Sequence, residues 1–327
     1  MKRVDENCLI VGGGKMGLLH GALINRVSGL RVSGIVDPSF QSRSVAKGIG
    51  ISAPIFSSVE SAIRKLDVGI AIICTPPKSH FPLAKKFMEN GWGVFVEKPL
   101  TMDSNLSQEL VDLAIKENLY NQVGFQLRFN PAIRFLYDYI NENGSDILGR
   151  IKSLEIEILS PQFSKITNQN LGLVRGGVEW DLLPHVADLA FYLMNVKRSG
   201  IISISETMKS SWRSVSTKIS LKDANIKLIA DWANSSVRKV ETRGELALIG
   251  ENRIYFDMDK VWLNGGEVLF HRRVQENPFF EIADQEYSFQ IKHLSDSVNG
   301  SVQGPAAGFE SGLLVDWAIG EMRDVES

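Results

Sequence analysis

The chain has few cysteines, no long apolar run and little net charge, and each shortage excludes a class of protein. Its two cysteines, Cys8 and Cys74, lie in apolar, strand-like runs, so we expect buried thiols in a reducing cytoplasm and no disulfide framework. No apolar stretch approaches the roughly 20 residues that span a bilayer, and the charged segment 1–7 does not resemble a secretory signal. A net charge of −2 without a basic block argues against a nucleic-acid surface.

The sequence also lacks a histidine and cysteine cluster with the spacing of metal ligands, so we expect no bound metal. What it does have is the composition of a folded protein, with 44% hydrophobic and 23% charged residues. A length of 327 residues exceeds one ordinary hydrophobic core. Two domains are therefore expected.

The first part of the chain alternates between strand-like and helix-like segments. The strand-like runs are Cys8–Val11, Val32–Val36, Val68–Cys74, Gly93–Val96 and Gln122–Phe125, and the helix-like runs are Leu18–Val27, Ser39–Gly48, Val59–Leu66, Phe81–Asn90 and Ser104–Asn118. This alternation, with almost continuously apolar strands, predicts an α/β domain with a doubly wound parallel sheet covered on both faces. We place this domain at residues 1–124.

Beyond Gly124 the pattern changes to consecutive strands. The expected helices are Asn130–Ile140, ending near Asn143-Gly144, then Asp181–Met194, Glu286–Val298 and Glu310–Met322. The expected strands are Lys152–Leu159, Ile201–Thr207, Val215–Leu221, Ile226–Asp231, Glu245–Ile249, Arg253–Asp257, Val261–Leu263 and Val268–His271. Strands without intervening helices predict a mainly antiparallel sheet in a second, α+β domain over residues 125–327. Its C-terminal helix is a candidate to pack back on the first domain.

The segment Gly12-Gly13-Gly14-Lys15-Met16-Gly17 stands between the first strand and the first helix. Its spacing is Gly-x-Gly-x-x-Gly, in which Gly12 permits a tight turn, Gly14 lets a pyrophosphate approach the backbone, and Gly17 lets helix and strand pack closely. The phosphates would lie at the helix N-terminus, beside Lys15 and Met16, where free N–H groups favour negative charge. The segment therefore predicts a dinucleotide site.

Asp37 follows Gly17 by twenty residues, at the end of the next strand. An acidic side chain there accepts hydrogen bonds from the adenosine ribose hydroxyls and repels a 2′-phosphate. Asp37 therefore favours NAD over NADP, although Arg43 is near enough in the sequence to keep NADP as an alternative.

Two further motifs follow strands at the edge of the sheet where ligands of such folds bind. Thr75-Pro76-Pro77, with His80 beginning the next helix, is placed to line the path of a cofactor; the alternative is an ordinary strand-to-helix turn. Glu97-Lys98-Pro99 puts an ionisable lysine at this edge. Such a lysine can exchange a proton with a substrate hydroxyl, and the alternative is a surface ion pair.

A third constellation, Asp181, His185 and Asp188, lies on one face of an expected helix. A carboxylate can orient an imidazole and leave its other nitrogen for a substrate hydroxyl. Because proline is poorly tolerated beyond the first turn, we expect the regular helix to begin near Pro184, with Asp181 in the preceding turn. The alternative is an Asp–His pair that only caps the helix.

Taken in order, these motifs resemble the Gfo/Idh/MocA oxidoreductases, the glucose–fructose oxidoreductase and inositol dehydrogenase group. The resemblance covers most of the chain and rests on Gly12-x-Gly14-x-x-Gly17, Asp37, Thr75-Pro76-Pro77 with His80, Glu97-Lys98-Pro99, Gly124-x-x-x-Arg128-x-x-Pro131 and Gly176-Gly177 with Asp181-x-x-x-His185-x-x-Asp188. It implies a Rossmann domain followed by an α/β domain with a large open sheet. Members associate through that sheet, so a homodimer or homotetramer is implied.

The resemblance also implies roles for single residues. Lys98 matches the family's catalytic lysine, and Asp181 and His185 match its acidic and histidine partners. The implied cofactor contacts are Gly12, Gly14, Lys15, Met16, Gly17, Asp37, Thr75, Pro76, His80, Glu97 and Lys98. Relatives often have a cis peptide bond at the position of Lys98-Pro99. The expected substrate-lining residues are Arg128, Asn130 and Trp180, with the polar loop Gln162–Arg175 as a further candidate.

One departure from the family pattern concerns the stretch Asp181-Leu182-Leu183-Pro184-His185. Many relatives carry glycine two residues after the acidic position, where this chain has Leu183. Because Lys98, Asp181 and His185 are all retained, we expect catalysis to be preserved. The shape of the substrate site is what Leu183 and Pro184 are expected to change.

The sequence therefore predicts an NAD-dependent dehydrogenase or reductase, with NADP as an alternative cofactor, acting on a sugar, polyol or nucleotide sugar. Either Lys98 or His185 takes the hydroxyl proton while hydride moves to nicotinamide C4. One alternative is the reduction of a keto-sugar or imine intermediate in a biosynthetic route. Another is a nucleotide-bound regulator without turnover, against which the retention of Lys98, Asp181 and His185 argues.

Overall fold

The computed structural model describes most of the chain, as two compact units. The described residues are 6–39, 53–148, 150–161, 177–211, 213–232, 236–237, 239–249, 252–272, 285–304 and 306–324. The first unit comprises Met1–Gln126 and Asn277–Leu313, and the second comprises Leu127–Glu276 and Leu314–Ser327. Among the described residues, no helix combines the length and the apolar character needed to cross a membrane.

The first unit contains a six-stranded parallel sheet in the order β3-β2-β1-β4-β5-β6. Its strands are β1 (Glu6–Val11), β2 (Leu30–Val36), β3 (Ile55–Phe56), β4 (Ile70–Ile73), β5 (Gly93–Val96) and β6 (Asn121–Val123). Every residue of β4 and β5 is buried, which explains why their sequences show no alternation of polar and apolar residues. The α/β fold class with a doubly wound parallel sheet is confirmed.

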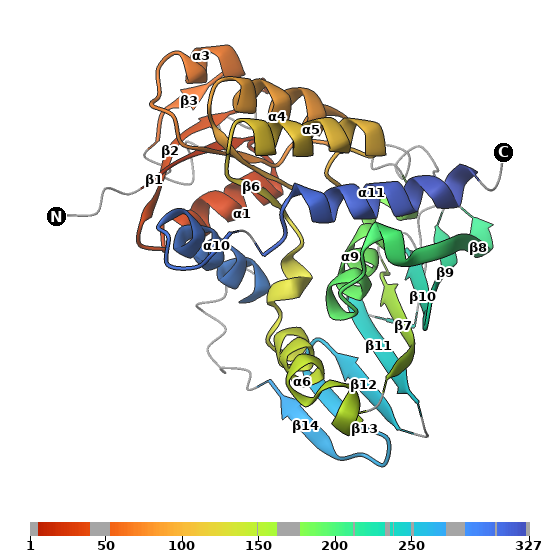
Figure 1. Ribbon diagram of the computed structural model, residues 1–327. Coiled ribbons are helices and arrows are strands. Elements are labelled where there is room, and N and C mark those ends of the chain that lie inside the picture. Colours follow the sequence, from red (N-terminus) through yellow and green to blue (C-terminus); the bar gives the residue numbers. More distant parts are fainter. Residues whose placement is uncertain are drawn as a thin grey trace. The chain divides into compact units, whose positions relative to one another are not determined.

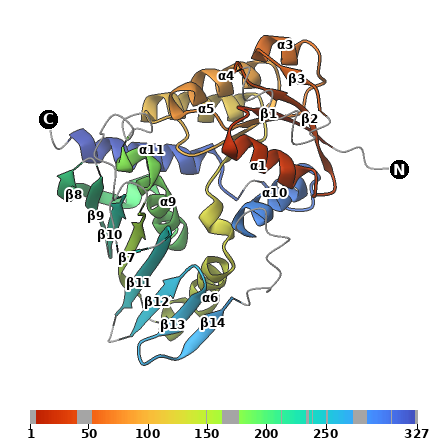
Figure 2. The same ribbon diagram turned by 180° about the vertical axis from the view of Figure 1, so that it is seen from behind.

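Helices cover both faces of this sheet (Figure 1). They are α1 (Lys15–Ile24), α3 (Val59–Ile63), α4 (His80–Glu89), α5 (Ser104–Lys116) and α10 (Gln285–Val298), with a short 3-10 turn at Pro77–Ser79. Helices α1 and α10 lie together on one face, and α4 and α5 lie on the other, as the view from behind also shows (Figure 2). Asp103 caps α5 by accepting hydrogen bonds from the N–H groups of Asn105 and Leu106.

Helix α10 joins the first unit although its residues are far from that unit in the sequence. The Ser295 hydroxyl donates to the carbonyl oxygen of Ser28 at 2.8 Å. Ile291 and Leu294 are fully buried in the same cluster as Ile24 and Phe95. Helix α10 thus packs with the Rossmann sheet, although the sequence pattern placed its residues in a second domain over 125–327.

The second unit contains an eight-stranded sheet in the order β14-β13-β12-β11-β7-β10-β9-β8. Its strands are β7 (Ile151–Leu159), β8 (Ile201–Ser211), β9 (Ser214–Leu221), β10 (Asn225–Asp231), β11 (Glu241–Leu248), β12 (Arg253–Asp257), β13 (Lys260–Leu263) and β14 (Val268–His271). The neighbours β10 and β7 run parallel, and the other pairs are antiparallel. The prediction of a large, mainly antiparallel sheet is confirmed.

Helices α6 (Pro131–Leu148) and α9 (Leu183–Leu193) pack on one face of this sheet, while α8 (Val178–Asp181) precedes α9. Helix α11 (Phe309–Asp324) contains the division between the two units, which falls after Leu313.

On β7, the side chains of Leu154, Ile156 and Ile158 are buried, and the intervening Glu155 is exposed. Strand β7 therefore shows the half-buried alternation expected from its sequence.

Three elements differ from their prediction. The two-residue strand β3 was not expected, because it is too short to show periodicity. Helix α6 continues to Leu148, beyond the expected stop at Asn143-Gly144. Within the range expected as helix over Asp181–Met194, the regular helix is α9, and Asp181 ends the short preceding helix α8, which was not expected. The expected helix Ser39–Gly48 lies outside the described residues from position 40 onward.

Candidate functional site

The glycine turn between β1 and α1 has a different requirement at each of its three glycines. Gly12 has a φ of +102°, a left-handed conformation that favours glycine. A Cβ atom on Gly17 would lie 1.9 Å from the carbonyl oxygen of Gly12, so only glycine lets the helix approach the turn this closely. A Cβ atom on Gly14 would meet nothing within 4 Å. Gly14 therefore leaves open space at the N-terminus of α1, where a phosphate would bind.

Lys15 and Met16 form the first turn of α1 directly after this space. The side chain of Lys15 is exposed and that of Met16 is half-buried. Both lie where the sequence predicts the pyrophosphate, and their contact with a cofactor remains a prediction.

Asp37 is held against the glycine turn by two backbone N–H groups. Its Oδ2 accepts a hydrogen bond from Gly13 N at 2.6 Å, and its Oδ1 accepts one from Ser39 N at 2.7 Å. The carboxylate is thereby oriented at the carboxyl end of β2, next to the turn that follows β1. This is the position from which an acidic side chain can reach the ribose of a dinucleotide.

Strand β4 ends beside the glycine turn, at the point where the strand order changes direction. Cys74 N donates to the carbonyl oxygen of Val11 at 2.8 Å. Beyond it, Thr75 is half-buried and accepts a hydrogen bond from the Ser79 hydroxyl at 2.8 Å, while Pro76 is exposed. Ligands of doubly wound sheets bind at such a switch point, here between β1 and β4.

Glu97 and Lys98 follow β5, the neighbour of β4. Glu97 is buried, and its Oε1 lies 2.6 Å from Nε2 of His20, which belongs to α1. A Cβ atom on Gly124 would lie 2.9 Å from Glu97 Oε2, so the glycine leaves room for this carboxylate. Lys98 is half-buried and the Lys98-Pro99 peptide bond is cis, as the family resemblance implies.

His80 is buried at the start of α4 and contacts backbone on both sides of its ring. Its Nδ1 lies 2.8 Å from the carbonyl oxygen of Pro99, and its Nε2 lies 2.8 Å from that of Thr75. Burial lowers the pKa of His80, while the two carbonyl oxygens oppose this shift. Because both ring nitrogens face protein carbonyls, His80 supports the two loops from within.

The second unit holds Asp181 and His185 at the junction of α8 and α9. Asp181 N donates to the carbonyl oxygen of Gly177 at 3.1 Å, and His185 N donates to that of Leu182 at 3.1 Å. Pro184 lies in the first turn of α9, so the expectation that the regular helix begins near Pro184 is confirmed. The side chains of Asp181 and His185 are half-buried.

Leu183 and Trp180, near the same junction, are both buried. The side chain of Leu183, which replaces the glycine common in relatives, has no exposed surface. Trp180 is likewise buried, and its Nε1 has no hydrogen-bond partner among the described residues. A substrate contact of Trp180 remains a prediction.

Arg128 and Asn130, also expected to line the substrate, have structural partners in the second unit. The Arg128 guanidinium forms an ion pair with Asp188. The Asn130 side chain accepts hydrogen bonds from the N–H groups of Ala132 and Ile133 at the start of α6, and donates to the carbonyl oxygen of Met258 at 2.9 Å. Gly176, Arg43 and the loop Gln162–Arg175 lie outside the described residues.

Comparison with known proteins connects the geometry of the first unit to a family. Residues 6–125 match the family model described as the oxidoreductase family with an NAD-binding Rossmann fold. The first unit therefore carries the NAD-binding domain of the Gfo/Idh/MocA oxidoreductases, and this match spans 6–125 of the 327 residues. The match covers the glycine turn, Asp37 and the Lys98 segment, so the family resemblance is confirmed where those motifs lie.

Among curated relatives, inositol 2-dehydrogenase of Corynebacterium glutamicum is 29% identical to this chain over 191 residues. That alignment covers 58% of this chain and 56% of the relative, so it spans little more than half of either protein. UDP-N-acetylglucosamine 3-dehydrogenase of Acidithiobacillus ferrooxidans is 25% identical over 210 residues, covering 62% of this chain and 61% of the relative.

Solved structures show that the likeness of fold extends over nearly the whole chain. Levoglucosan dehydrogenase, solved with NADH and levoglucosan, superposes with a TM-score of 0.82 at 20% identity, covering 99% of this chain and 98% of that chain. The UDP-N-acetylglucosamine 3-dehydrogenase of Acidithiobacillus ferrooxidans superposes with a TM-score of 0.78 at 19% identity, covering 98% and 97%. At these identities the likeness shows the fold.

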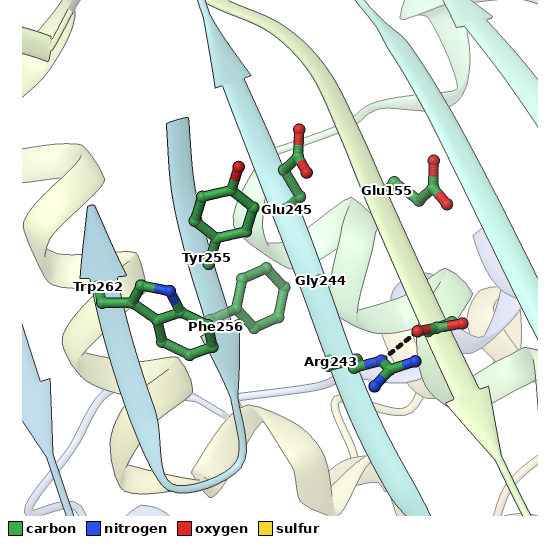
Figure 3. Close-up of a pocket in the computed structure, with 8 residues that line it drawn as sticks. Glu155, Arg243, Gly244, Glu245, Tyr255, Phe256 and Trp262 are labelled. Carbon is green, nitrogen blue, oxygen red and sulfur yellow. Dashed lines mark hydrogen bonds and ion pairs between the residues drawn. The ribbon is translucent and has the colours of Figure 1, made fainter. Parts of the chain in front are cut away.

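The second unit also has a shallow hollow of about 210 Å³ on the open face of its sheet (Figure 3). It is lined by Glu155, Glu157, Arg243, Gly244, Glu245, Tyr255, Phe256 and Trp262. Arg243 pairs with Glu157, and the rings of Tyr255 and Trp262 stack with centroids 5.9 Å apart. Because α9 packs on the other face of this sheet, the hollow is separate from Asp181 and His185.

His20 is the residue of this region that the sequence analysis did not single out. It follows Gly17 by three residues on α1 and is fully buried against Glu97. Its proximity to the glycine motif was the available signal, but nothing in the sequence spacing links it to a residue 77 positions away.

Within the described ranges, no group of three or more His, Cys, Asp or Glu side chains is arranged to hold a metal ion.

Proposed function

We propose that this protein is an NAD-dependent dehydrogenase or reductase that transfers hydride between nicotinamide and a hydroxyl-bearing or keto carbon. The observation that carries the proposal lies within the first unit. Asp37 is oriented beside the open glycine turn, and Lys98 follows the buried strand β5 at the same carboxyl edge of the sheet. A dinucleotide-binding edge that also carries an ionisable lysine suits alcohol–ketone chemistry.

The substrate we propose is a sugar, a polyol or a nucleotide sugar. The support comes from the names of similar proteins, which include inositol 2-dehydrogenase, UDP-N-acetylglucosamine 3-dehydrogenase and levoglucosan dehydrogenase. Arg128 and Asn130 are also proposed to line the substrate site, although Arg128 binds Asp188 and Asn130 binds the carbonyl oxygen of Met258.

In the proposed reaction, each functional residue has one task. A bound nicotinamide would accept or donate hydride at C4. Asp37 binds the adenosine ribose, and Gly14 admits the pyrophosphate. Lys98 or His185 takes the proton from the substrate hydroxyl in the oxidative direction and returns it in the reductive direction, and Asp181 orients His185.

Two further parts of the proposal concern the setting of the enzyme. We infer a cytoplasmic location, supported by the two free cysteines, of which Cys8 is buried. We also infer a homodimer or homotetramer formed through the open face of the second sheet, supported by the aromatic pair Tyr255 and Trp262 on that face. Light scattering during size-exclusion chromatography tests the oligomeric state directly.

The first experiment is a fluorescence titration of the purified protein with NADH and with NADPH. Tight, selective NADH binding supports the role of Asp37 and leads to a screen of inositols, anhydrosugars and nucleotide sugars for NAD reduction. A preference for NADPH would direct the search to the alternative, reduction of a keto-sugar or imine. Binding without turnover of any substrate would support a regulator, and binding of neither nucleotide would refute the proposal.

The second experiment compares two lysine variants on the substrate found. Lys98→Ala should lower kcat by about 10²–10⁴-fold, the usual contribution of a positioned acid or base. Lys116→Ala is the matched control, because Lys116 lies on the surface and pairs only with its exposed neighbour Glu117 among the contacts described. Equal activity of both variants would remove Lys98 from the reaction.

A further inference from the structure

The two residues next to Lys98 in the sequence, Glu97 and Pro99, each contact a fully buried histidine. His20 Nε2 is 2.6 Å from Glu97 Oε1, and His80 Nδ1 is 2.8 Å from the carbonyl oxygen of Pro99. Both imidazoles are 0% exposed. We propose that His20 and His80 are positioning residues that hold the chain on both sides of Lys98 and so determine where its ammonium group can reach.

His20 ties Glu97 to the helix that begins at the glycine turn. The histidine lies on α1, and its ring meets the ring of Phe95 edge-on with centroids 5.2 Å apart. The ring of Tyr287, on α10, also meets the imidazole edge-on, with ring centroids 6.1 Å apart. Gly124 leaves room for the Glu97 carboxylate, so His20 and Glu97 can pack closely against each other in the buried interior. The residue before Lys98 is therefore fixed relative to α1.

His80 ties Pro99 to the loop after β4. Its Nδ1 faces the Pro99 carbonyl, and its Nε2 faces the Thr75 carbonyl, both at 2.8 Å. A neutral imidazole has one N–H and donates to one of these oxygens, whereas an imidazolium donates to both. In either form both nitrogens face backbone, so His80 acts on a reaction at this edge only through the loops it joins.

The two contacts matter because lysine has a long side chain with many rotamers. A proton transfer requires the donor and acceptor atoms to approach to about 3 Å, and a misplacement of about 1 Å can cost about 10²-fold in rate. With the Glu97 side chain and the Pro99 carbonyl oxygen both held, the backbone of Lys98 has little freedom, and the reach of its ammonium group depends on where that backbone is placed. This inference rests on the proposed function, since it assumes that Lys98 exchanges a proton.

The test uses two replacements at each histidine. His20→Leu and His80→Leu fill the space without a polar group, whereas His20→Gln and His80→Gln keep an amide that can reach the same oxygen. His271→Gln on β14 is the control, because His271 is exposed in the second unit. NADH affinity, kcat, KM and thermal stability are measured for each variant at a temperature where all are folded.

We expect each leucine variant to lower kcat about tenfold to a hundredfold, the cost of a misplaced catalytic group, with NADH affinity and KM changed by less than about threefold. The glutamine variants should recover most of kcat, and His271→Gln should match the wild type. Unchanged kcat in the leucine variants would overturn the proposal. The proposal would also be overturned if the glutamine variants lost as much kcat as the leucine variants and the loss in each variant followed its thermal stability.

A double-variant comparison shows whether the histidines act through Lys98. In a protein that already carries Lys98→Ala, His20→Leu or His80→Leu should lower the residual rate by less than about twofold, because residues acting as one unit are not additive. If the same tenfold loss appears with and without Lys98, the histidines act elsewhere and the inference is wrong.

One readout separates this inference from the proposed function, because it needs no turnover. The rate at which an amine-acetylating reagent modifies Lys98 is followed against pH by peptide mass spectrometry, with Lys116 as the internal reference. The leucine variants should shift the Lys98 profile and leave that of Lys116 unchanged. If the wild type lacks dehydrogenase activity and the leucine variants still show this shift, the proposed function is refuted and the positioning role is retained. An active enzyme without the shift would refute the positioning role.

Discussion

The guanidinium of Arg128 binds the carboxylate of Asp188 through two hydrogen bonds, from Nε to Oδ2 at 2.8 Å and from Nη2 to Oδ1 at 2.6 Å. The side chains are only 10% and 1% exposed. Burial raises the pKa of Asp188, and the adjacent Arg128 opposes this rise. Arg128 also lies over the ring of Tyr192, 5.0 Å from its centroid. The pair therefore joins the segment before α6 to α9 inside the second unit.

Breaking this ion pair on one side should be strongly destabilising. Arg128→Met leaves the Asp188 carboxylate buried without its partner and should lower the free energy of unfolding by about 3–5 kcal/mol, measured by urea denaturation. The double variant Arg128→Met/Asp188→Leu should recover much of that loss, because neither charge remains to be buried. A loss below about 1 kcal/mol in the single variant, typical of a surface pair, would contradict a structural role and favour Arg128 as a substrate contact.

The glycine turn offers a matched pair of single substitutions with opposite consequences. Gly17→Ala places a Cβ atom 1.9 Å from the Gly12 carbonyl oxygen, so we expect loss of the folded protein in a thermal melt. Gly14→Ala meets nothing within 4 Å and has a φ of −76°, so the fold should be retained. The added methyl group at Gly14 occupies the space proposed for the pyrophosphate, and NADH affinity should fall by at least about tenfold. Wild-type NADH affinity of Gly14→Ala would place the phosphates elsewhere.

How much of this site could be predicted depended on whether its residues are neighbours in the chain. The turn at Gly12–Gly17 and the start of α9 near Pro184 follow from local backbone preferences, and both were predicted. The pairing of His20 with Glu97 and the packing of α10 on α1 join residues far apart in sequence. No local pattern encodes such contacts, because periodicity reports which face of an element is buried and not what buries it.

The family resemblance, and no local pattern, suggested Arg128 and Asn130 as substrate-lining residues. That role stays a prediction, and the structure adds partners that the sequence did not indicate. In the structure their partners are Asp188, Met258 and the first N–H groups of α6. Asn130 is followed by Pro131 at the first position of α6, which is a local signature of a helix N-terminus. That signature was the available signal for a capping role.

Cofactor selectivity should depend on the charge of Asp37. Asp37→Ala removes the proposed acceptor of the ribose hydroxyls and the repulsion of a 2′-phosphate. NADH affinity should fall by at least about tenfold, the cost of losing a hydrogen bond to a charged group, and NADPH affinity should rise. Paired fluorescence titrations measure both. Asp67→Ala, at an exposed position of the same unit, is the control. Unchanged affinity for both nucleotides in Asp37→Ala would remove this carboxylate from the cofactor site.

The stability of the first unit should fall in mild acid because of His80. Burial lowers the pKa of His80 below its ordinary value of 6.5, against the opposing effects of the Pro99 and Thr75 carbonyls and Glu97, while Lys98 adds to the lowering. Below pH 6.5 the unfolded chain therefore binds a proton that the folded chain does not, so the stability present above 6.5 is lost as the pH falls toward the folded pKa.

The matching experiment compares the wild type with His80→Gln by urea denaturation at about pH 7.5 and about pH 5.5. Between these values the wild type should lose about 1 kcal/mol more than the variant, within the limit of about 1.4 kcal/mol per pH unit for one proton. Glutamine is neutral at both values, and it can still donate to the carbonyl oxygen of Pro99. Equal losses in the two proteins would mean that folded His80 is protonated at the lower pH and donates to both carbonyl oxygens.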